Sequence, residues 1–181
     1  MLLSLEHISD DVLLGLWQID ANPALSPREN ERQAVHSLLA VMTSDTLELS
    51  HADNGKPLVD GYQISISHTK GFVAIMLSKT RNVGVDIEYV SNRVARIAKR
   101  FLRNDECASN ITALLIHWCS KETIYKLYSE ENLTYQQMKV VDYQPSQPVF
   151  HVESESSQGV KALTEVYYRV TPDYILTYSY L

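Results

Sequence analysis

The first forty residues pass from an apolar run into an amphipathic helix. Residues 12–19 are almost continuously apolar, which is typical of a buried strand. Ser26, Pro27 and Glu29 then predict a helix start, because they supply an N-cap, a proline at the first helical position and the partner of a capping box. Apolar residues at helical spacing extend this helix to about Met42.

Turns and alternating strands follow that helix. The segment 54–57 contains Asn-Gly and a proline, which predict a turn. Residues 62–67 place two isoleucines on one face, and the turn at 69–71 leads into an apolar strand at 72–77, so the pair predicts a hairpin. A further turn precedes a third strand at 83–88.

The second half opens with two predicted helices. At 100° per residue, the segment 93–103 separates an apolar side from a basic side. The apolar side comprises Val94, Ile97, Ala98 and Phe101, and the basic side comprises Arg93, Arg96, Arg100 and Arg103. A longer helix is predicted from about Ile111 to Tyr128.

Short β-rich runs separated by turns complete the chain. They lie at 139–143, 148–152, 164–170 and 174–180. Because strands are mixed with few helices and show no repeating β-α-β order, the pattern predicts an α+β fold.

Composition narrows the class of protein. The 181 residues carry a formal charge of −6 and are 45% apolar, which indicates one folded domain or two small halves sharing a core. No apolar run reaches the roughly 18–20 residues of a membrane span, and the N-terminus lacks the pattern of a signal peptide. With only Cys107 and Cys119, a reducing, cytoplasmic setting is expected. The acidic balance argues against nucleic acid as the main partner.

Two carboxylates stand out on the strand at 83–88. Gly84, Asp86 and Glu88 share one face of it, opposite a face of Val and Ile. Like charges placed side by side repel unless a cation lies between them, and carboxylate oxygens suit Mg²⁺. Gly84 leaves room beside the pair. The alternative is a solvated strand face with two ordinary acids.

A second candidate stripe lies on the predicted helix after residue 111. Trp118, Glu122 and Tyr125 or Lys126 lie at helical spacing, and a stripe of this mixed character is neither a usual core nor a usual solvent face. The competing interpretation is a surface pair of Glu122 and Lys126 over a half-buried tryptophan. His68, at a strand end before a turn, is a weaker candidate by itself.

Taken in order, these segments resemble a known family. They are Asn54-Gly55-Lys56-Pro57, Ile66-Ser67-His68, Gly84-Val85-Asp86-Ile87-Glu88, Ala98-Lys99-Arg100-Phe101 and Trp118-x-x-Lys121-Glu122-x-x-x-Lys126. The series resembles the 4′-phosphopantetheinyl transferases of the surfactin-synthetase-activating type, which include holo-[acyl-carrier-protein] synthases.

The resemblance implies a fold and a reaction. It implies two similar halves related by a pseudo-twofold axis, with the active site in the cleft between them. Here the halves would be residues 1–79, on the nucleotide side, and 80–181, with the metal-binding strand and the Trp118 helix. The reaction would move the phosphopantetheine arm of coenzyme A to a serine of an apo carrier protein, with Mg²⁺, and release 3′,5′-ADP.

The resemblance also implies roles for individual residues. Asp86, Glu88 and Glu122 would hold Mg²⁺ against the diphosphate, and Glu122 is the candidate to take the serine proton. Lys126 and Lys121 would neutralise diphosphate oxygens. On the nucleotide side, Lys56 and Pro57 would border the adenine, and Ser67 and His68 would bind the phosphate end.

The first predicted helix departs from the family pattern. Arg32 matches one basic position expected for the 3′-phosphate, but Glu29 falls where a second would be, and His36 replaces an arginine. Ser37 still offers a hydroxyl. Fewer fixed positive charges predict weaker discrimination for coenzyme A over its dephospho form.

The basic side of the 93–103 segment has a role if the resemblance holds. Carrier proteins are typically acidic, so these arginines would steer them to the cleft, whereas the alternative is a solvated helix face. A chain with both halves would act as a monomer. Two other functions stay open: a non-catalytic relative that binds coenzyme A or a carrier without turnover, and an unrelated Mg²⁺-dependent phosphate-binding domain.

Overall fold

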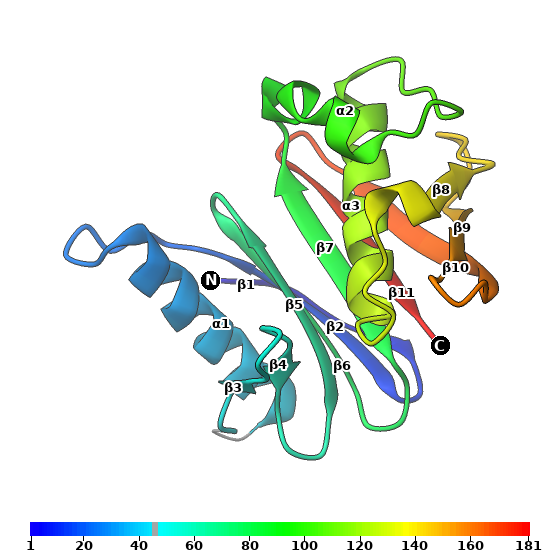
Figure 1. Ribbon diagram of the computed structural model, residues 1–181. Helices are drawn as coiled ribbons and strands as arrows, with labels where there is room; N and C mark the ends of the chain where they lie inside the picture. The colour runs from blue at the N-terminus through cyan, green and yellow to red at the C-terminus, as the bar shows by residue number, and fades with distance from the viewer. Residues whose placement is uncertain (45–46) are drawn as a thin grey trace.

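The strands of the first half form a four-stranded antiparallel sheet in the order β1-β2-β6-β5. The computed structural model describes residues 1–44 and 47–181. The sheet consists of β1 (Leu2–Ser9), β2 (Val12–Gln18), β5 (Gln63–Thr69) and β6 (Phe72–Ser78), and two short strands, β3 (Ser50–His51) and β4 (Pro57–Leu58), pair beside it. The helix α1 (Pro27–Thr43) packs its apolar stripe on the outer face of this sheet (Figure 1).

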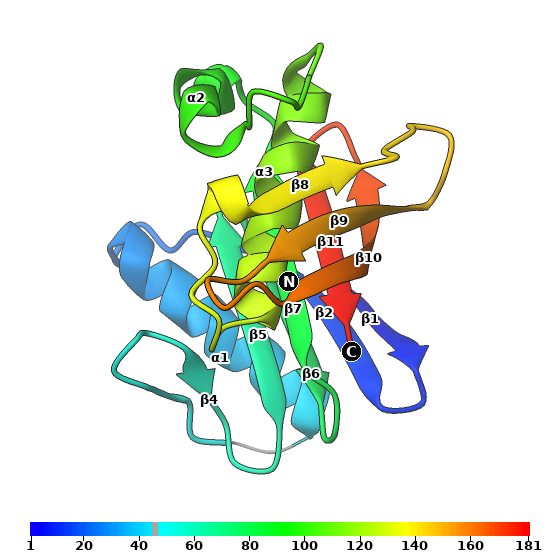
Figure 2. The same ribbon diagram turned by 45° about the vertical axis from the view of Figure 1, so that its right-hand side comes forward.

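The second half forms a five-stranded antiparallel sheet in the order β7-β11-β10-β9-β8. Its strands are β7 (Val83–Tyr89), β8 (Met138–Val141), β9 (Val149–Glu155), β10 (Lys161–Val170) and β11 (Tyr174–Tyr180). The long helix α3 (Ile111–Leu127) lies along β7 and β11 and covers one face of the sheet, as Figures 1 and 2 show. Short 3₁₀ helices at Asn92–Arg96 (η1) and Tyr135–Gln137 (η2) and a four-residue helix α2 (Ala98–Phe101) complete the half.

The two sheets share an apolar core between them. Alternate residues of β2 and β6 pack on the Val83, Val85 and Ile87 face of β7 and on β11. The opposite face of β7 points to α3, where a second core joins α3 to β8, β9 and β10. The chain therefore stacks as helix, sheet, sheet and helix, and this arrangement confirms the expected α+β class.

Most of the predicted elements are present. The first helix has the predicted capping box, because the Glu29 N–H donates to Ser26 Oγ at 3.3 Å and the Ser26 N–H donates to Glu29 Oε2 at 2.8 Å. The hairpin turns at Gly71, whose φ of +87° favours glycine. The strand β1 was not predicted from the sequence. In the described residues, no helix is both long and apolar enough to cross a membrane.

The single helix predicted at 93–103 is wrong. The segment divides into η1 and α2, with Ile97 between them outside helical geometry. Neither piece has a side-chain N-cap, and each buries only one side chain. Little therefore stabilises one continuous helix over this segment. Arg103 lies beyond α2, where Asp105 and the Gln136 carbonyl bind its guanidinium. The basic side is therefore shorter than predicted and consists of the exposed Arg93, Arg96 and Arg100.

Close packing of α3 on β7 depends on a glycine. A Cβ built on Gly84 would collide with the Thr123 carbonyl oxygen and lie 3.0 Å from Leu127 Cβ. A Cβ built on Gly15, in β2, would meet instead the flexible side chain of Met42, 2.6 Å from its Sδ. The first contact involves helix backbone, which cannot move aside without shifting α3.

We therefore expect Gly84→Ala to destabilise the protein by about 3 kcal/mol, and Gly15→Ala by about 1 kcal/mol. Denaturant unfolding monitored by circular dichroism would measure both free energies of unfolding. Equal losses in the two variants would contradict the proposed difference between backbone and side-chain contact.

Candidate active site between the two sheets

The edges of the two sheets meet where β5 runs beside β7. No main-chain ladder joins these strands among the described residues; side-chain hydroxyls of β5 instead accept hydrogen bonds from alternate β7 amides. The pairs are Val85 N–H with Ser65 Oγ at 3.0 Å, Ile87 N–H with Ser67 Oγ at 3.2 Å, and Tyr89 N–H with Thr69 Oγ1 at 3.3 Å. These hydroxyls satisfy backbone groups that would otherwise be buried without partners.

The same hydroxyls bind the acidic face of β7. Ser67 Oγ donates to Asp86 Oδ1 at 2.8 Å, and Lys126 Nζ on α3 donates to the same oxygen at 2.7 Å. Lys126 also donates to the Val85 carbonyl at 2.9 Å. Asp86 is 5% exposed, and its Oδ2 is buried without a hydrogen-bond partner in the described part of the chain. One oxygen of this aspartate is therefore fixed, and the other is left for a ligand.

The two glutamates near Asp86 are each held by neutral donors. Thr69 Oγ1 donates to Glu88 Oε2 at 3.0 Å, and Trp118 Nε1 donates to Glu88 Oε1 at 3.3 Å. The hydroxyl of Tyr135 donates to Glu122 Oε1 at 2.5 Å. The two acids lie on different elements, Glu88 on β7 and Glu122 on α3.

Burial and mutual repulsion dominate the electrostatics. Burial raises the pKa of Glu88 above its usual value, and the negative charge of Asp86 adds to this effect. Burial, followed by the charge of Asp86, likewise raises the pKa of Glu122. The pKa of the buried Cys119 thiol is raised by the same two causes, with a further contribution from Glu88. The site favours any ligand that brings positive charge.

The three carboxylates do not form a ready-made metal site. Across residues 1–44 and 47–181, no set of three or more His, Cys, Asp or Glu side chains lies in an arrangement that would hold a metal ion. Two features nevertheless fit a cation: the unpartnered Asp86 Oδ2, and the raised pKa values of Glu88 and Glu122. Oxygen donors of this kind suit Mg²⁺.

Three hollows lie near this acidic group, and neighbouring hollows share lining residues. The first, of about 820 Å³, is lined by Glu88, Trp118 and Arg93, whereas neither Asp86 nor Glu122 lines any of the three. A second, of about 940 Å³, lies against the start of α1, and a smaller one of about 210 Å³ includes Lys126 and Tyr125. The two larger volumes fall within the usual range for small-molecule sites.

Several predicted nucleotide-side residues line these hollows. Arg32, Pro57 and His68 line the hollow against α1, and Lys56 lines the smaller one with Pro57. Lys56 Nζ also lies 3.4 Å from Oε1 of Glu130, which belongs to the segment after α3. Ser37 does not line any of the three hollows.

The lining of the hollow against α1 carries both signs of charge. Its basic side chains include Arg28 and Arg32, whereas Glu29 and Glu31 bring two carboxylates. The Glu29 carboxylate is bound by Ser26 in the capping box. Glu31 Oε2 lies 3.4 Å from Nδ1 of His68. Both glutamates therefore reduce the positive charge at this end of the cleft.

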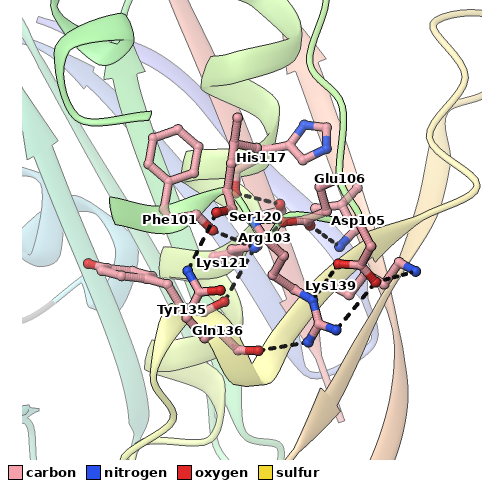
Figure 3. Close-up of polar contacts among 12 residues, drawn as sticks. Phe101, Arg103, Asp105, Glu106, His117, Ser120, Lys121, Tyr135, Gln136 and Lys139 are labelled. Atoms are coloured by element: carbon pink, nitrogen blue, oxygen red, sulfur yellow. Dashed lines mark hydrogen bonds and ion pairs between the residues drawn. The ribbon is translucent and has the colours of Figure 1, made fainter. Parts of the chain in front are cut away.

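Two predicted ligand contacts do not match the structure. The Ser67 hydroxyl is already bound to Asp86 and to the Ile87 amide. Ser67 and His68 are neighbours on β5 and therefore point to opposite faces of the strand, so they do not reach one phosphate together. Lys121 is fully buried, with Nζ 2.6 Å from Glu106 Oε2 and 2.7 Å from the Phe101 carbonyl (Figure 3). Its ammonium is therefore committed to an internal ion pair and is not brought to the Asp86 group.

The interpretation of Glu122 and Lys126 as a surface pair is also wrong. Lys126 forms its ion pair with Asp86, and Glu122 accepts the Tyr135 hydroxyl. The sequence reasoning missed the roles of Thr69 and Tyr135. The alternation of Ser65, Ser67 and Thr69 was visible, but a polar strand face of this kind ordinarily indicates solvent. No local pattern could have paired Tyr135 with Glu122.

Comparison with family models identifies the family of the chain. A family model described as the 4′-phosphopantetheinyl transferase superfamily matches residues 82–178, more than half of the chain. The chain belongs to the 4′-phosphopantetheinyl transferase superfamily. No curated protein matches the chain. Membership points to a transferase that moves phosphopantetheine to carrier proteins, and the matched range contains Asp86, Glu88 and Glu122.

The raised pKa of Glu88 predicts a pH-dependent stability. Its pKa in the folded state lies above the value in the unfolded chain, so the folded state binds the proton more tightly. Stability then falls as pH rises from about 4.5 through the raised pKa. Without metal at pH 7, we expect Glu88→Gln to raise Tm by about 2–4 °C. This gain should disappear as the pH approaches 4.5.

Thermal unfolding in EDTA across this pH range would measure the effect. Glu131→Gln is the matched control, because Glu131 is an exposed glutamate beyond the end of α3. If Glu88→Gln and Glu131→Gln differed from the wild type by the same Tm at every pH, burial of Glu88 would not explain the effect.

Proposed function

We propose that the chain transfers the 4′-phosphopantetheine arm of coenzyme A to a serine of an apo carrier protein, as a holo-acyl-carrier-protein synthase. The observation that supports this most directly is the buried Asp86, with Lys126 on one oxygen and no partner on the other among the described residues. A lysine and an aspartate side by side suit a diphosphate and its metal counterion, because the lysine can face the negative phosphate oxygens and the aspartate can face the cation.

The reaction assigns a task to each group. The serine oxygen attacks the β-phosphorus of coenzyme A, so a bond from phosphorus to serine forms and the bond to the bridging oxygen breaks. The electron pair leaves on 3′,5′-ADP. Lys126 would place its positive charge beside the oxygens that gain charge. Burial raises the pKa of Glu122, which makes its carboxylate a stronger proton acceptor, so we assign the serine proton to it.

The metal expected for this chemistry is Mg²⁺. Asp86, Glu88 and Glu122 would hold it, with the unpartnered Asp86 Oδ2 as the first ligand. When bound, Mg²⁺ supplies charge neutralisation and polarises the phosphoryl oxygens.

The hollow against α1 would take the nucleotide end of coenzyme A. Arg32 lines it and carries a positive charge for a phosphate, His68 lines it with a ring nitrogen that can form a hydrogen bond, and Lys56 and Pro57 would border the adenine. Glu29 and Glu31 offset part of that charge, which supports the prediction of weaker discrimination against dephospho-coenzyme A. In this proposal residues 1–79 and 80–181 act as two halves related by a pseudo-twofold axis, within one monomer.

The function can be tested by the intact mass of carrier proteins. With coenzyme A, Mg²⁺ and a panel of apo carriers, we expect one carrier to gain a single phosphopantetheine arm, and EDTA to abolish the gain. Asp86→Ala should reduce the rate by at least about 100-fold, because it removes the fixed anion of the site.

Asp142→Ala is the matched control, since Asp142 is exposed and accepts its hydrogen bond from the His151 N–H, away from the three carboxylates. A wild-type rate in Asp86→Ala would contradict the proposed chemistry. Binding of coenzyme A without a gain in mass on any carrier would favour instead the non-catalytic binder.

An exposed basic surface would receive the carrier. Arg93, Arg96 and Arg100 project from η1 and α2, and Arg93 lines the same hollow as Glu88. Arg103 does not contribute, because Asp105 neutralises it. A basic surface beside the catalytic group would attract an acidic carrier and raise its association rate.

We expect Arg96→Glu/Arg100→Glu to reduce kcat/KM for the carrier about tenfold at low salt, and much less at high salt, where the charges are screened. Initial rates at two ionic strengths would measure this. Lys79→Glu/Lys161→Glu, which changes the net charge equally at exposed lysines on other elements, should have little effect. Equal losses in the two double variants would rule out local steering.

A further inference from the structure

Tyr135 is held at both ends by consecutive residues of α3. Its hydroxyl donates to Glu122 Oε1 at 2.5 Å, and its carbonyl oxygen accepts a hydrogen bond from Lys121 Nζ at 3.3 Å. Lys121 and Glu122 are adjacent in sequence, and both form hydrogen bonds with Tyr135, which follows them by more than a dozen residues. The side chain of Tyr135 is half-buried, and its ring centroid lies 5.4 Å from that of Trp118.

The contact of Lys121 with Tyr135 belongs to a buried ion pair that ties several segments together. Lys121 Nζ lies 2.6 Å from Glu106 Oε2, and both side chains are almost completely buried (Figure 3). Glu106 also accepts the Val140 N–H at 2.7 Å and the Arg103 N–H at 2.8 Å. Burying both charges carries a large desolvation cost, which their mutual attraction offsets. Removal of either side chain would leave the other charge buried without compensation. The pair therefore fixes η2, which carries Tyr135, against α3.

Trp118, which packs against Tyr135, contacts Glu88 in the way that Tyr135 contacts Glu122. Trp118 donates from Nε1 to Glu88, as Tyr135 donates from its hydroxyl to Glu122. The two packed rings thus place one neutral donor on each of the glutamates around Asp86. Each donor can orient a carboxylate without contributing a charge that would compete with a bound cation.

We propose that Tyr135 is a positioning residue that holds the Glu122 carboxylate by Oε1 and leaves Oε2 for the ligand of the site. The inference rests on the proposed function, because it assigns Glu122 to the metal and diphosphate. In the described chain Glu122 Oε2 has no hydrogen-bond partner, whereas Oε1 is occupied by the phenol.

The variant Tyr135→Phe tests this role because it removes one hydroxyl and keeps the ring against Trp118. Binding of Mn²⁺, as a spectroscopic substitute for Mg²⁺, can be followed by electron paramagnetic resonance without substrate. We expect Tyr135→Phe to weaken Mn²⁺ binding about tenfold, as loss of an outer-shell partner typically does. In the transfer assay, kcat should fall while KM for coenzyme A stays within about twofold.

Tyr128→Phe is the matched control. Tyr128 is the C-cap residue of α3, and its hydroxyl lies 2.9 Å from Thr164 Oγ1 on β10, so it contacts none of the three carboxylates. This variant should bind Mn²⁺ like the wild type. Thermal unfolding of both variants would show whether each folds, and similar Tm values would allow their affinities to be compared directly.

The variant Asp86→Ala distinguishes a failure of the positioning role of Tyr135 from a failure of the proposed metal site. If Asp86→Ala abolishes Mn²⁺ binding and Tyr135→Phe leaves it unchanged, the positioning role is wrong and the metal site stands. If Asp86→Ala binds Mn²⁺ as tightly as the wild type, the acidic group is not the metal site and both proposals fail. A loss confined to kcat, without any change in Mn²⁺ affinity, would also overturn the assignment of Tyr135 to ligand positioning.

Discussion

The structure depends on how two sheet edges are buried against each other without a main-chain ladder. A buried strand edge needs partners for its amides, and β5 supplies them as hydroxyls from Ser65, Ser67 and Thr69. Hydroxyls can donate as well as accept, so two of them also bind the Asp86 and Glu88 carboxylates. This edge contact, which joins the halves together with the shared apolar core, also carries the acidic groups into a buried position.

The helix α3 completes that position. Gly84 allows its backbone to approach β7 closely, and Lys126 then reaches Asp86 from the helix side. Along one helix, Lys121 and Lys126 have different roles, since Lys121 binds Glu106 in the interior and Lys126 stays partly open to the hollows. The helix thus serves two purposes: one lysine fixes the surrounding segments, and the other provides charge at the site.

Much of the fold could be predicted from local pattern. The capping box, the hairpin around Gly71 and the strand of Asp86 each follow from a few neighbouring residues, and the structure contains all three. The prediction failed for 93–103, where amphipathic spacing indicated one helix but no capping side chain sustains it. The joining of the two sheets through the polar face of β5 was not predicted, because burial of that face depends on β7 in the other sheet.

The order of residues alone is enough to show which side chains are available: two acids on one strand face, and a helix with tryptophan, glutamate and lysines at fixed spacing. Those relations arise from the periods of strand and helix, which any such segment has. The partners of these side chains depend on how the segments pack in three dimensions. This packing pairs Lys126 with Asp86, buries Lys121 with Glu106 and brings Tyr135 to Glu122. Each of these choices joins separate segments, and only packing determines which of them meet.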